Sequence, residues 1–243
     1  VCVANCLFCS FARLMPGDAD AYTLTLEQAL DKLRRRAHEP ITEVHVVNGL
    51  HPDLPFDYYT SLLRGLKAIK PSIHLKCFTA VEIAFFADLY RMTDEQVLRE
   101  LMAAGLDSLP GGGAEVFSAR VRAKICADKC DADRWLAIHR AAHALGMRSN
   151  VTMLCGHIET FEERVDHMLR VRALQDETGG FQAFIPLAVH PDNNQMRRLP
   201  APPASETLRV HAVARLMLDN VPHVKAFWIA TGIEVAQASL WFG

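Results

Sequence analysis

A short β-rich run followed by an amphipathic helix recurs along the whole chain, and this alternation limits the possible folds more than any other feature. Periodicity predicts strands at about 42–47, 73–78, 106–109, 148–153, 181–185 and 224–229. It predicts helices at about 26–38, 56–69, 81–104 in two pieces, 114–124, 132–145, 160–175 and 205–219, and a final amphipathic segment that reaches Leu240. Such alternation is typical of a parallel sheet with helical crossovers.

Local signals support these elements and favour a barrel. Capping boxes predict helix starts at Thr25/Gln28, Thr93/Gln96 and Thr160/Glu163. The predicted strand from Arg148 to Met153 alternates polar with apolar residues, whereas the strands of a doubly wound sheet are apolar throughout. The chain has 243 residues, enough for two average domains or for one α/β barrel of roughly 250. Because no linker or low-complexity tract interrupts it, we expect one domain over 1–243.

Composition argues against several classes of partner. The 26 basic and 28 acidic side chains leave a net charge of −2, without the positive field that nucleic acids or anionic membranes attract. The longest uncharged stretch, 178–191, contains two prolines and a glycine pair, so no membrane span is expected. The first residues lack the basic and apolar regions of a signal peptide. The seven cysteines, an odd number, argue against a disulfide framework and for a reducing, cytoplasmic compartment.

The most specific motif is the spacing C-x3-C-x2-C formed by Cys2, Cys6 and Cys9. Three thiolates this close in sequence can converge on one centre and leave one coordination position for another ligand. A structural zinc site would need a fourth ligand nearby, but the next cysteine is Cys77 and the next histidine is His38, inside a predicted helix. Three unrelated buried cysteines are the other alternative. We favour a 4Fe-4S cluster with one open iron, which implies a bound cofactor.

This cysteine loop resembles that of the radical S-adenosylmethionine (SAM) superfamily. The resemblance continues through 47–52, 78–83, 109–115, 150–160 and 179–188, which are similar to the menaquinone (futalosine) pathway branch. It implies a TIM-type (β/α) barrel, truncated at both ends because the first strand before Cys2 and the last strand are missing. It further implies that Cys2, Cys6 and Cys9 hold a 4Fe-4S cluster whose fourth iron chelates the amino and carboxylate groups of SAM.

The resemblance also implies a reaction. Reductive cleavage of SAM would give a 5′-deoxyadenosyl radical that adds to an aryl enol ether carrying two carboxylates, a transferase reaction of menaquinone biosynthesis. The electron would come from an external one-electron donor such as flavodoxin or ferredoxin. A related reaction of the same branch abstracts hydrogen instead of adding to an alkene. From another class, a non-catalytic iron-sulfur or zinc protein would use its thiolates for structure or electron transfer.

Several residues are candidates for contact with SAM, each with a structural alternative. The superfamily's Gly-Gly-Glu element reads Asn48-Gly49-Leu50-His51 here, so a backbone carbonyl is expected to replace the missing acidic contact to the methionyl amine. The others follow or lie on strands, where they could contact the nucleoside: Glu82, Gly111, Gly112, Gly113, Glu115, Asn150 and Thr152. The alternatives are helix-start glutamates, a tight turn, and buried polar residues that satisfy each other.

A substrate with two carboxylates calls for cationic or hydrogen-bonding groups. Five candidates fall in or near loops after strands, and one or two are expected to touch substrate: His51, Arg120, Arg122, His157 and His190.

The remaining metal-type side chains are interpreted as structural. His139 and His143 are one helical turn apart and flank no acidic partner. Cys126 and Cys130 form a second C-x3-C, which its Lys-Asp-rich surroundings place in an exposed turn. Cys77 and Cys155 are expected in the core or in a pocket wall.

Overall fold

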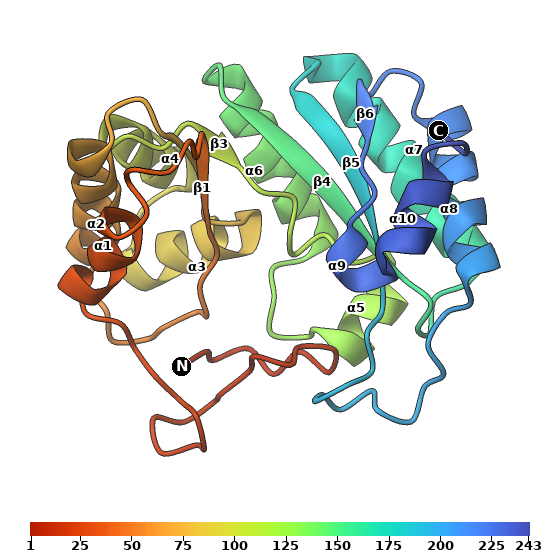
Figure 1. The fold of residues 1–243 in the computed structure, drawn as a ribbon, viewed down its shortest axis with the longest axis horizontal. Coiled ribbons are helices and arrows are strands. Elements are labelled where there is room, and N and C mark those ends of the chain that lie inside the picture. The colour runs from red at the N-terminus through yellow and green to blue at the C-terminus, as the bar shows by residue number, and fades with distance from the viewer.

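Six parallel strands form one sheet in the computed structural model, which describes residues 1–243 (Figure 1). The strands are β1 (Glu43–Val46), β2 (His74–Cys77), β3 (Ser108–Leu109), β4 (Arg148–Cys155), β5 (Phe181–Ala188) and β6 (His223–Val224). The helices are α1 (Leu26–Arg34), α2 (Phe56–Ile69), α3 (Ala80–Tyr90), α4 (Asp94–Ala103), α5 (Ala119–Ile125), α6 (Ala132–Ala144), α7 (Phe161–Thr178), α8 (Ala204–Met217), α9 (Trp228–Thr231) and α10 (Ile233–Ser239).

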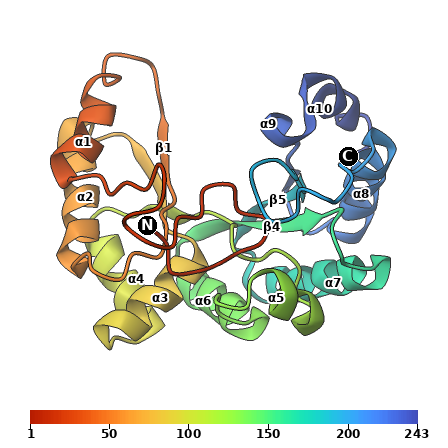
Figure 2. The ribbon, with the colours of Figure 1, turned by 90° about the horizontal axis from the view of Figure 1, so that it is seen from below.

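The strand order is β1-β2-β3-β4-β5-β6, the same as the chain order. A doubly wound sheet would reverse direction at a switch point, whereas a barrel adds each strand beside the last. The sheet is curved, and helices follow its outer side in an arc that does not close (Figure 2). The expected fold class, an incomplete TIM-type barrel, is confirmed. None of the helices combines the length and apolar character that crossing a bilayer requires.

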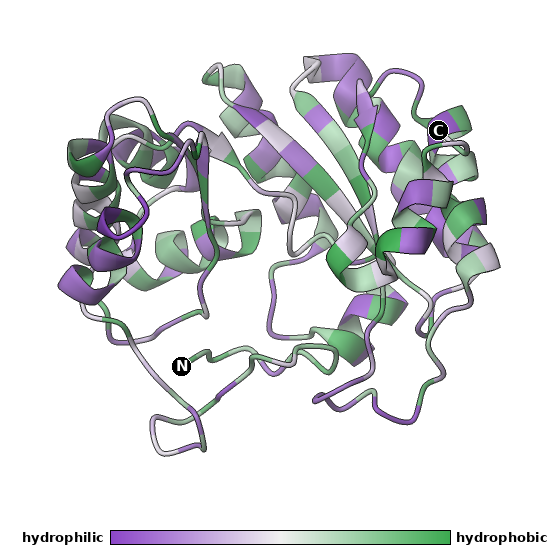
Figure 3. Cartoon of the chain, viewed as in Figure 1, coloured by the Kyte–Doolittle hydropathy of each residue, from purple (hydrophilic) through white to green (hydrophobic).

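The core lies between the sheet and its outer helices. β4 is hydrophilic at its start, alternates from Asn150 to Met153 and is hydrophobic at its end (Figure 3). Val151 and Met153 are fully buried in the core, together with Trp135 of α6 and Phe181 of β5. Asn150 and Thr152 lie on the other face of β4, because successive side chains of a strand point to opposite sides.

Helix starts are set by local capping. The three predicted capping boxes, at Thr25, Thr93 and Thr160, are confirmed. A fourth, which the sequence analysis missed, opens α3 at Thr79, whose side chain accepts from the Glu82 amide while Glu82 accepts from the Thr79 amide. This box fixes the start of α3 directly after β2.

Two predicted elements were wrong. The helix expected from 114 begins only at Ala119, because Glu115 adopts a left-handed φ of 46° and Ser118 caps the helix by accepting from the Val121 amide. The strand expected over 224–229 ends at Val224, and residues 228–231 form α9 instead. Beyond β6 the Lys225 amide still donates to the Phe184 carbonyl of β5. The amides of Ala230 and Thr231 instead donate to the Phe227 carbonyl, which begins a helix.

A chain of neutral polar groups joins α6, β4 and α7. Thr178 donates to the Leu174 carbonyl, so it accepts from Nδ1 of His143 (2.7 Å). Nε2 of His143 therefore accepts from the Ser149 hydroxyl (2.7 Å), which in turn accepts from Nδ1 of His139 (2.8 Å). Burial lowers the pKa of His143 to about 4 and that of His139 well below its ordinary value. The two histidines thus pack as uncharged structural groups.

Acid should weaken this layer. The unfolded chain takes up protons at these histidines below about pH 6.5, whereas folded His143 does so only near pH 4, so the free energy of unfolding should fall as the pH drops through that interval. His143→Gln should flatten the dependence, measured by urea unfolding at several pH values. The exposed His38→Gln controls for the substitution itself. If the free energy of unfolding of His143→Gln depended on pH as steeply as that of the wild type, the neutral state of His143 would be contradicted.

Candidate functional site

The cysteine segment lies along the edge of the sheet at which the strands end (Figures 1 and 2). Residues 1–25 form no helix or strand. Some of their backbone groups pair within this range, such as the Cys2 amide with the Arg13 carbonyl (2.8 Å), and others need partners elsewhere, since buried N–H and C=O groups are nearly always paired. The partners come from three segments: the loop after β1, the α5–α6 loop, and the segment after β5.

The loop after β1 holds Cys2. The Leu50 amide donates to Sγ of Cys2 (3.3 Å), and the Val3 amide donates to the Leu50 carbonyl (3.0 Å). A Cβ on Gly49 would lie 2.4 Å from the Val1 carbonyl oxygen and 2.9 Å from Cβ of Cys2. Only glycine permits this approach, so Gly49 has a defined role at the cysteine segment.

The other two thiols lie in one turn, closed by a hydrogen bond from the Cys9 amide to the Cys6 carbonyl (3.1 Å). Cys6 is buried, which raises the pKa of its thiol to about 12, whereas Cys2 and Cys9 are half-buried. No three Cys, His, Asp or Glu side chains converge where they could hold one metal ion.

The α5–α6 loop holds the middle of the segment. The Asn5 amide donates to Oδ2 of Asp128 (2.8 Å), and the Leu7 amide donates to the Ile125 carbonyl (2.9 Å). The turn expected around the second C-x3-C is exposed at Ala127 and Asp128, but its cysteines are not: Cys126 is 1% exposed and Cys130 is half-buried. The two thiols are thus covered although the turn between them is exposed.

The segment after β5 bonds to the part of the cysteine segment that follows Cys6. The Gln195 amide donates to the Leu7 carbonyl (2.9 Å), and Nδ2 of Asn194 donates to the Phe8 carbonyl (3.1 Å). Ser10 donates to the Asp192 carbonyl (2.8 Å). Residues 189–203 form no helix or strand, and these hydrogen bonds join their first part to the cysteine segment.

A family model for the radical SAM superfamily matches residues 1–171, and one for the CofH/MqnC C-terminal region matches 178–243. The chain belongs to the radical SAM superfamily. The family implies a 4Fe-4S cluster and SAM as cofactors. Cysteine thiolates are the ligands of such clusters, so Cys2, Cys6 and Cys9 match the required donor type, and their binding of a cluster stays a prediction.

Relatives from the same superfamily cover the whole chain. The aminodeoxyfutalosine synthases of Streptomyces coelicolor and Thermus thermophilus are both 47% identical to it, and the chain spans 65% and 66% of their lengths. A 5-amino-6-(D-ribitylamino)uracil–L-tyrosine 4-hydroxyphenyl transferase of Methanopyrus kandleri is 41% identical, and a cyclic dehypoxanthine futalosine synthase of Halalkalibacterium halodurans is 39% identical. The solved structure of methylornithine synthase (PylB) has the same fold, with a TM-score of 0.76 and 15% sequence identity. The match covers 98% of this chain and 65% of that chain.

Glu82 and Asn48, both candidates for contact with SAM, bond to each other in this radical SAM chain. The amide and Nδ2 of Asn48 donate to Oε1 of Glu82 (2.9 and 3.3 Å), and the amide and hydroxyl of Thr79 donate to Oε2 (2.7 and 2.9 Å). Burial raises the pKa of Glu82 to about 7, against these hydrogen bonds. Glu82 thus joins the loops after β1 and β2 and shapes the loop that holds Cys2.

Each carbonyl of the glycine run Gly111–Gly113 accepts a hydrogen bond from a side chain. Thr152 donates to Gly111 (2.7 Å), Trp135 to Gly112 (3.1 Å), and Arg122 to Gly113 (3.2 Å). A Cβ on Gly111 would lie 2.6 Å from the Val151 backbone, so close strand packing requires this glycine. No helix starts here, so the expected helix amides are not available to a ligand. Contact with SAM stays a prediction for these glycines.

Glu115, Asn150 and Thr152 have different surroundings. Glu115 is buried and paired with Lys129, next to the cysteine segment. Thr152 bonds to Gly111, as described. Asn150 borders a cavity of about 500 Å³ with Lys76 and Lys225, five residues before the end of β4, which corresponds to about 16 Å along the strand.

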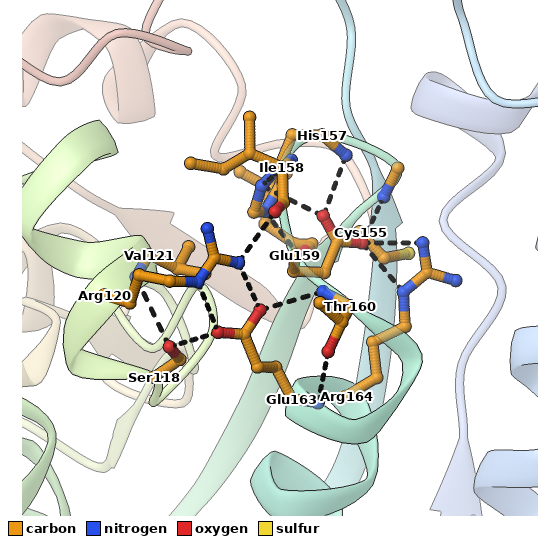
Figure 4. Close-up of polar contacts among 12 residues, drawn as sticks. Ser118, Arg120, Val121, Cys155, His157, Ile158, Glu159, Thr160, Glu163 and Arg164 are labelled. Atoms are coloured by element: carbon orange, nitrogen blue, oxygen red, sulfur yellow. Dashed lines mark hydrogen bonds and ion pairs between the residues drawn. The ribbon is translucent and has the colours of Figure 1, made fainter.

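Two of the substrate candidates, Arg120 and His157, already bond to other protein groups in the network shown in Figure 4. Arg120 pairs with Glu163 (2.6 Å) and donates to the Ile158 carbonyl (2.9 Å). The His157 side chain is fully buried, with Nε2 donating to the Leu154 carbonyl (3.0 Å) and Nδ1 beside Glu159 (3.0 Å). Their contact with substrate remains a prediction, and any such contact would have to compete with these bonds.

The other three candidates differ in accessibility. Arg122 is buried and donates to the carbonyls of Ala114 (2.8 Å) and Cys130. Nε2 of His51 bonds to Thr23 (3.0 Å), and its Nδ1 accepts from the Asp53 amide (3.1 Å). The His190 side chain is 60% exposed.

Sequence reasoning missed the residues that hold the cysteine segment. They are Leu50, Asp128, Lys129, Asn194 and Gln195. The Lys-Asp-rich composition around Cys126 and Cys130 was the one available signal, and it was interpreted as solvent exposure.

Substitution of Gly49 should loosen the cysteine segment. Gly49→Ala forces Cβ against Val1 and Cys2, which should cost about 1–3 kcal/mol of stability and lower the iron bound after anaerobic reconstitution. Gly17→Ala, in the same segment with no atom within 4 Å of the added Cβ, is the control. Equal iron content and unfolding free energy in both variants would count against the close approach.

Glu82 should be sensitive to loss of its second acceptor oxygen. In Glu82→Gln one acceptor oxygen becomes an NH2 donor, which would face the two donors of either Asn48 or Thr79. The free energy of unfolding, measured in urea, should therefore fall by about 1–3 kcal/mol. Gln96→Glu, the reverse change in the exposed α4 capping box, should change stability by less than about 0.5 kcal/mol. Similar losses in both variants would show that capping alone explains the effect.

Proposed function

We propose that this chain carries the catalytic barrel of an aminodeoxyfutalosine synthase. The observation that carries the proposal is 47% identity over the whole chain to two enzymes of that name. The reaction would add the 5′-deoxyadenosyl group of SAM to 3-[(1-carboxyvinyl)oxy]benzoate and, with loss of a carboxyl group, give 6-amino-6-deoxyfutalosine.

The cluster and SAM, when bound, would supply the 5′-deoxyadenosyl radical. Cys2, Cys6 and Cys9 would hold the cluster. Because burial keeps Cys6 protonated without metal, binding there would release a proton. The Leu50 amide would donate to the sulfur of Cys2, and hydrogen bonds to the sulfurs are one determinant of cluster potential.

The substrate would bind near the same strand ends. Of the five candidate cationic groups, the accessible His190 and the half-buried His51 are the most available to carboxylates. Arg120 and Arg122 would instead fix loops through Glu163 and through carbonyl groups. The protein's main task would be to align the vinyl carbon with the radical and to exclude water.

We further propose one catalytic domain over 1–243, a cytoplasmic location and a soluble one-electron donor such as flavodoxin or ferredoxin. The sheet continues across the boundary of the two family regions, because β4 and β5 pair along seven residue positions. All seven cysteines are free thiols, which supports a reducing compartment.

Cyclic dehypoxanthine futalosine synthase activity is the alternative within the pathway. It is supported by 39% identity over the whole chain to an enzyme of that name. A non-catalytic iron-sulfur or zinc protein is the alternative from another class.

Anaerobic reconstitution and substrate feeding test the proposal. The protein should take up four irons per chain, turn brown and change its electron paramagnetic resonance spectrum when SAM is added. With SAM, a reductant and the aryl enol ether, mass spectrometry should detect aminodeoxyfutalosine. Cyclic dehypoxanthine futalosine from its own precursor would support the alternative enzyme, and one zinc without a spectral change would overturn both.

A cysteine series provides the control for the cluster. Serine at Cys2, Cys6 or Cys9 should abolish the spectrum. Cys130→Ser, at a half-buried thiol outside the motif, should retain four irons per chain. Loss of the cluster in Cys130→Ser alone would point to a different ligand set.

A further inference from the structure

A buried ion pair adjoins the cysteine segment. Nζ of Lys129 lies 2.7 Å from Oε1 of Glu115, and the two side chains are 15% and 7% exposed. Burying two charges is costly and is tolerated when the charges satisfy each other. Burial lowers the pKa of Lys129, but Glu115 outweighs it and the net pKa is raised, so the ammonium group stays charged.

Glu115 is fixed independently of Lys129. It is one of few non-glycine residues in the left-handed region, with φ 46°, a conformation that persists only where its surroundings enforce it. Its carbonyl accepts from the Leu154 amide (2.9 Å) near the end of β4. The carboxylate therefore extends from a rigid position beside the strand ends.

Lys129 contacts both Glu115 and the cysteine segment. Its Nζ lies 5.0 Å from the ring centroid of Phe8, the residue directly before Cys9. A cation over an aromatic face is attracted to it. The same α5–α6 loop accepts hydrogen bonds from the amides of Asn5 and Leu7, on both sides of Cys6.

The two charges of the pair lie differently relative to the cysteine segment. Nζ of Lys129 lies over the Phe8 ring, whereas the Glu115 carboxylate bonds to Lys129. The positive end of the pair thus contacts the segment that carries the thiols. A cluster held by thiolates is anionic, and its potential depends on net charge and surroundings.

We propose that Lys129 is a positioning residue that fixes the Cys6–Cys9 turn through Phe8 and raises the reduction potential of the cluster. This inference rests on the proposed function only in requiring that the cysteines hold a cluster. Glu115 holds the ammonium group in place and lowers the potential by a smaller amount.

The test is the midpoint potential of the reconstituted cluster, from a redox titration followed by paramagnetic resonance without substrate. Lys129→Met should shift the potential to more negative values and Glu115→Gln to more positive values. The double variant, which leaves no buried charge unpaired, should fall between them. Lys124→Met removes an exposed lysine of α5 and should leave the potential unchanged.

A second measurement tests the positioning role without metal. In the metal-free full chain, the amides of Asn5 and Leu7 should exchange hydrogen faster in Lys129→Met and in the double variant than in Lys124→Met. Unchanged exchange would overturn the positioning role. Unchanged potentials in loaded, folded Lys129→Met and double variants would overturn the electrostatic role.

The two proposals can fail separately. A wild-type chain that takes up no cluster would refute the proposed function and the electrostatic role together. A wild-type chain that makes no aminodeoxyfutalosine but shows the predicted order of potentials would refute only the synthase activity.

Discussion

The geometry of the three thiols depends on hydrogen bonds between a segment without regular structure and loops that follow strands. The amides of Val3, Asn5 and Leu7 donate to Leu50, Asp128 and Ile125, all outside the segment. A loop that cannot satisfy its own backbone must take its shape from its surroundings. The sheet thus sets where the sulfurs lie, although it contributes none of them.

Two buried carboxylates at this edge are stabilised in different ways. Glu82 receives four hydrogen bonds from uncharged donors on two loops, whereas Glu115 receives one ammonium group. The first arrangement ties the loops after β1 and β2 together. The second joins the loop after β3 to the α5–α6 loop. The two carboxylates thus join these four loops in two pairs beside the cysteine segment.

Features encoded by neighbouring residues were predictable. The cysteine spacing, three capping boxes and the alternation of strands and helices all span a few residues, so their patterns are legible in the sequence. The β4 alternation correctly favoured a barrel, because polar residues on one face and core residues on the other fit a curved sheet. The fold class could be inferred from these features.

Features set by distant contacts were not predictable. Cys126 lies in a turn of charged composition, and tertiary packing buries its side chain although the turn itself is exposed. The left-handed Glu115 interrupts a segment whose composition favours a helix. The Glu163 partner of Arg120 also comes from tertiary structure, so sequence position alone did not reveal that this arginine was already engaged.

The long chain separation of these contacts has a consequence for biogenesis. Asn5 bonds to Asp128, 123 residues away, and to Gln195, 190 residues away. Contacts of such separation form late, after the intervening chain has closed into place. During synthesis the thiols leave the ribosome before Gln195 does, so their arrangement is completed only after β5 and the segment that follows it have been made.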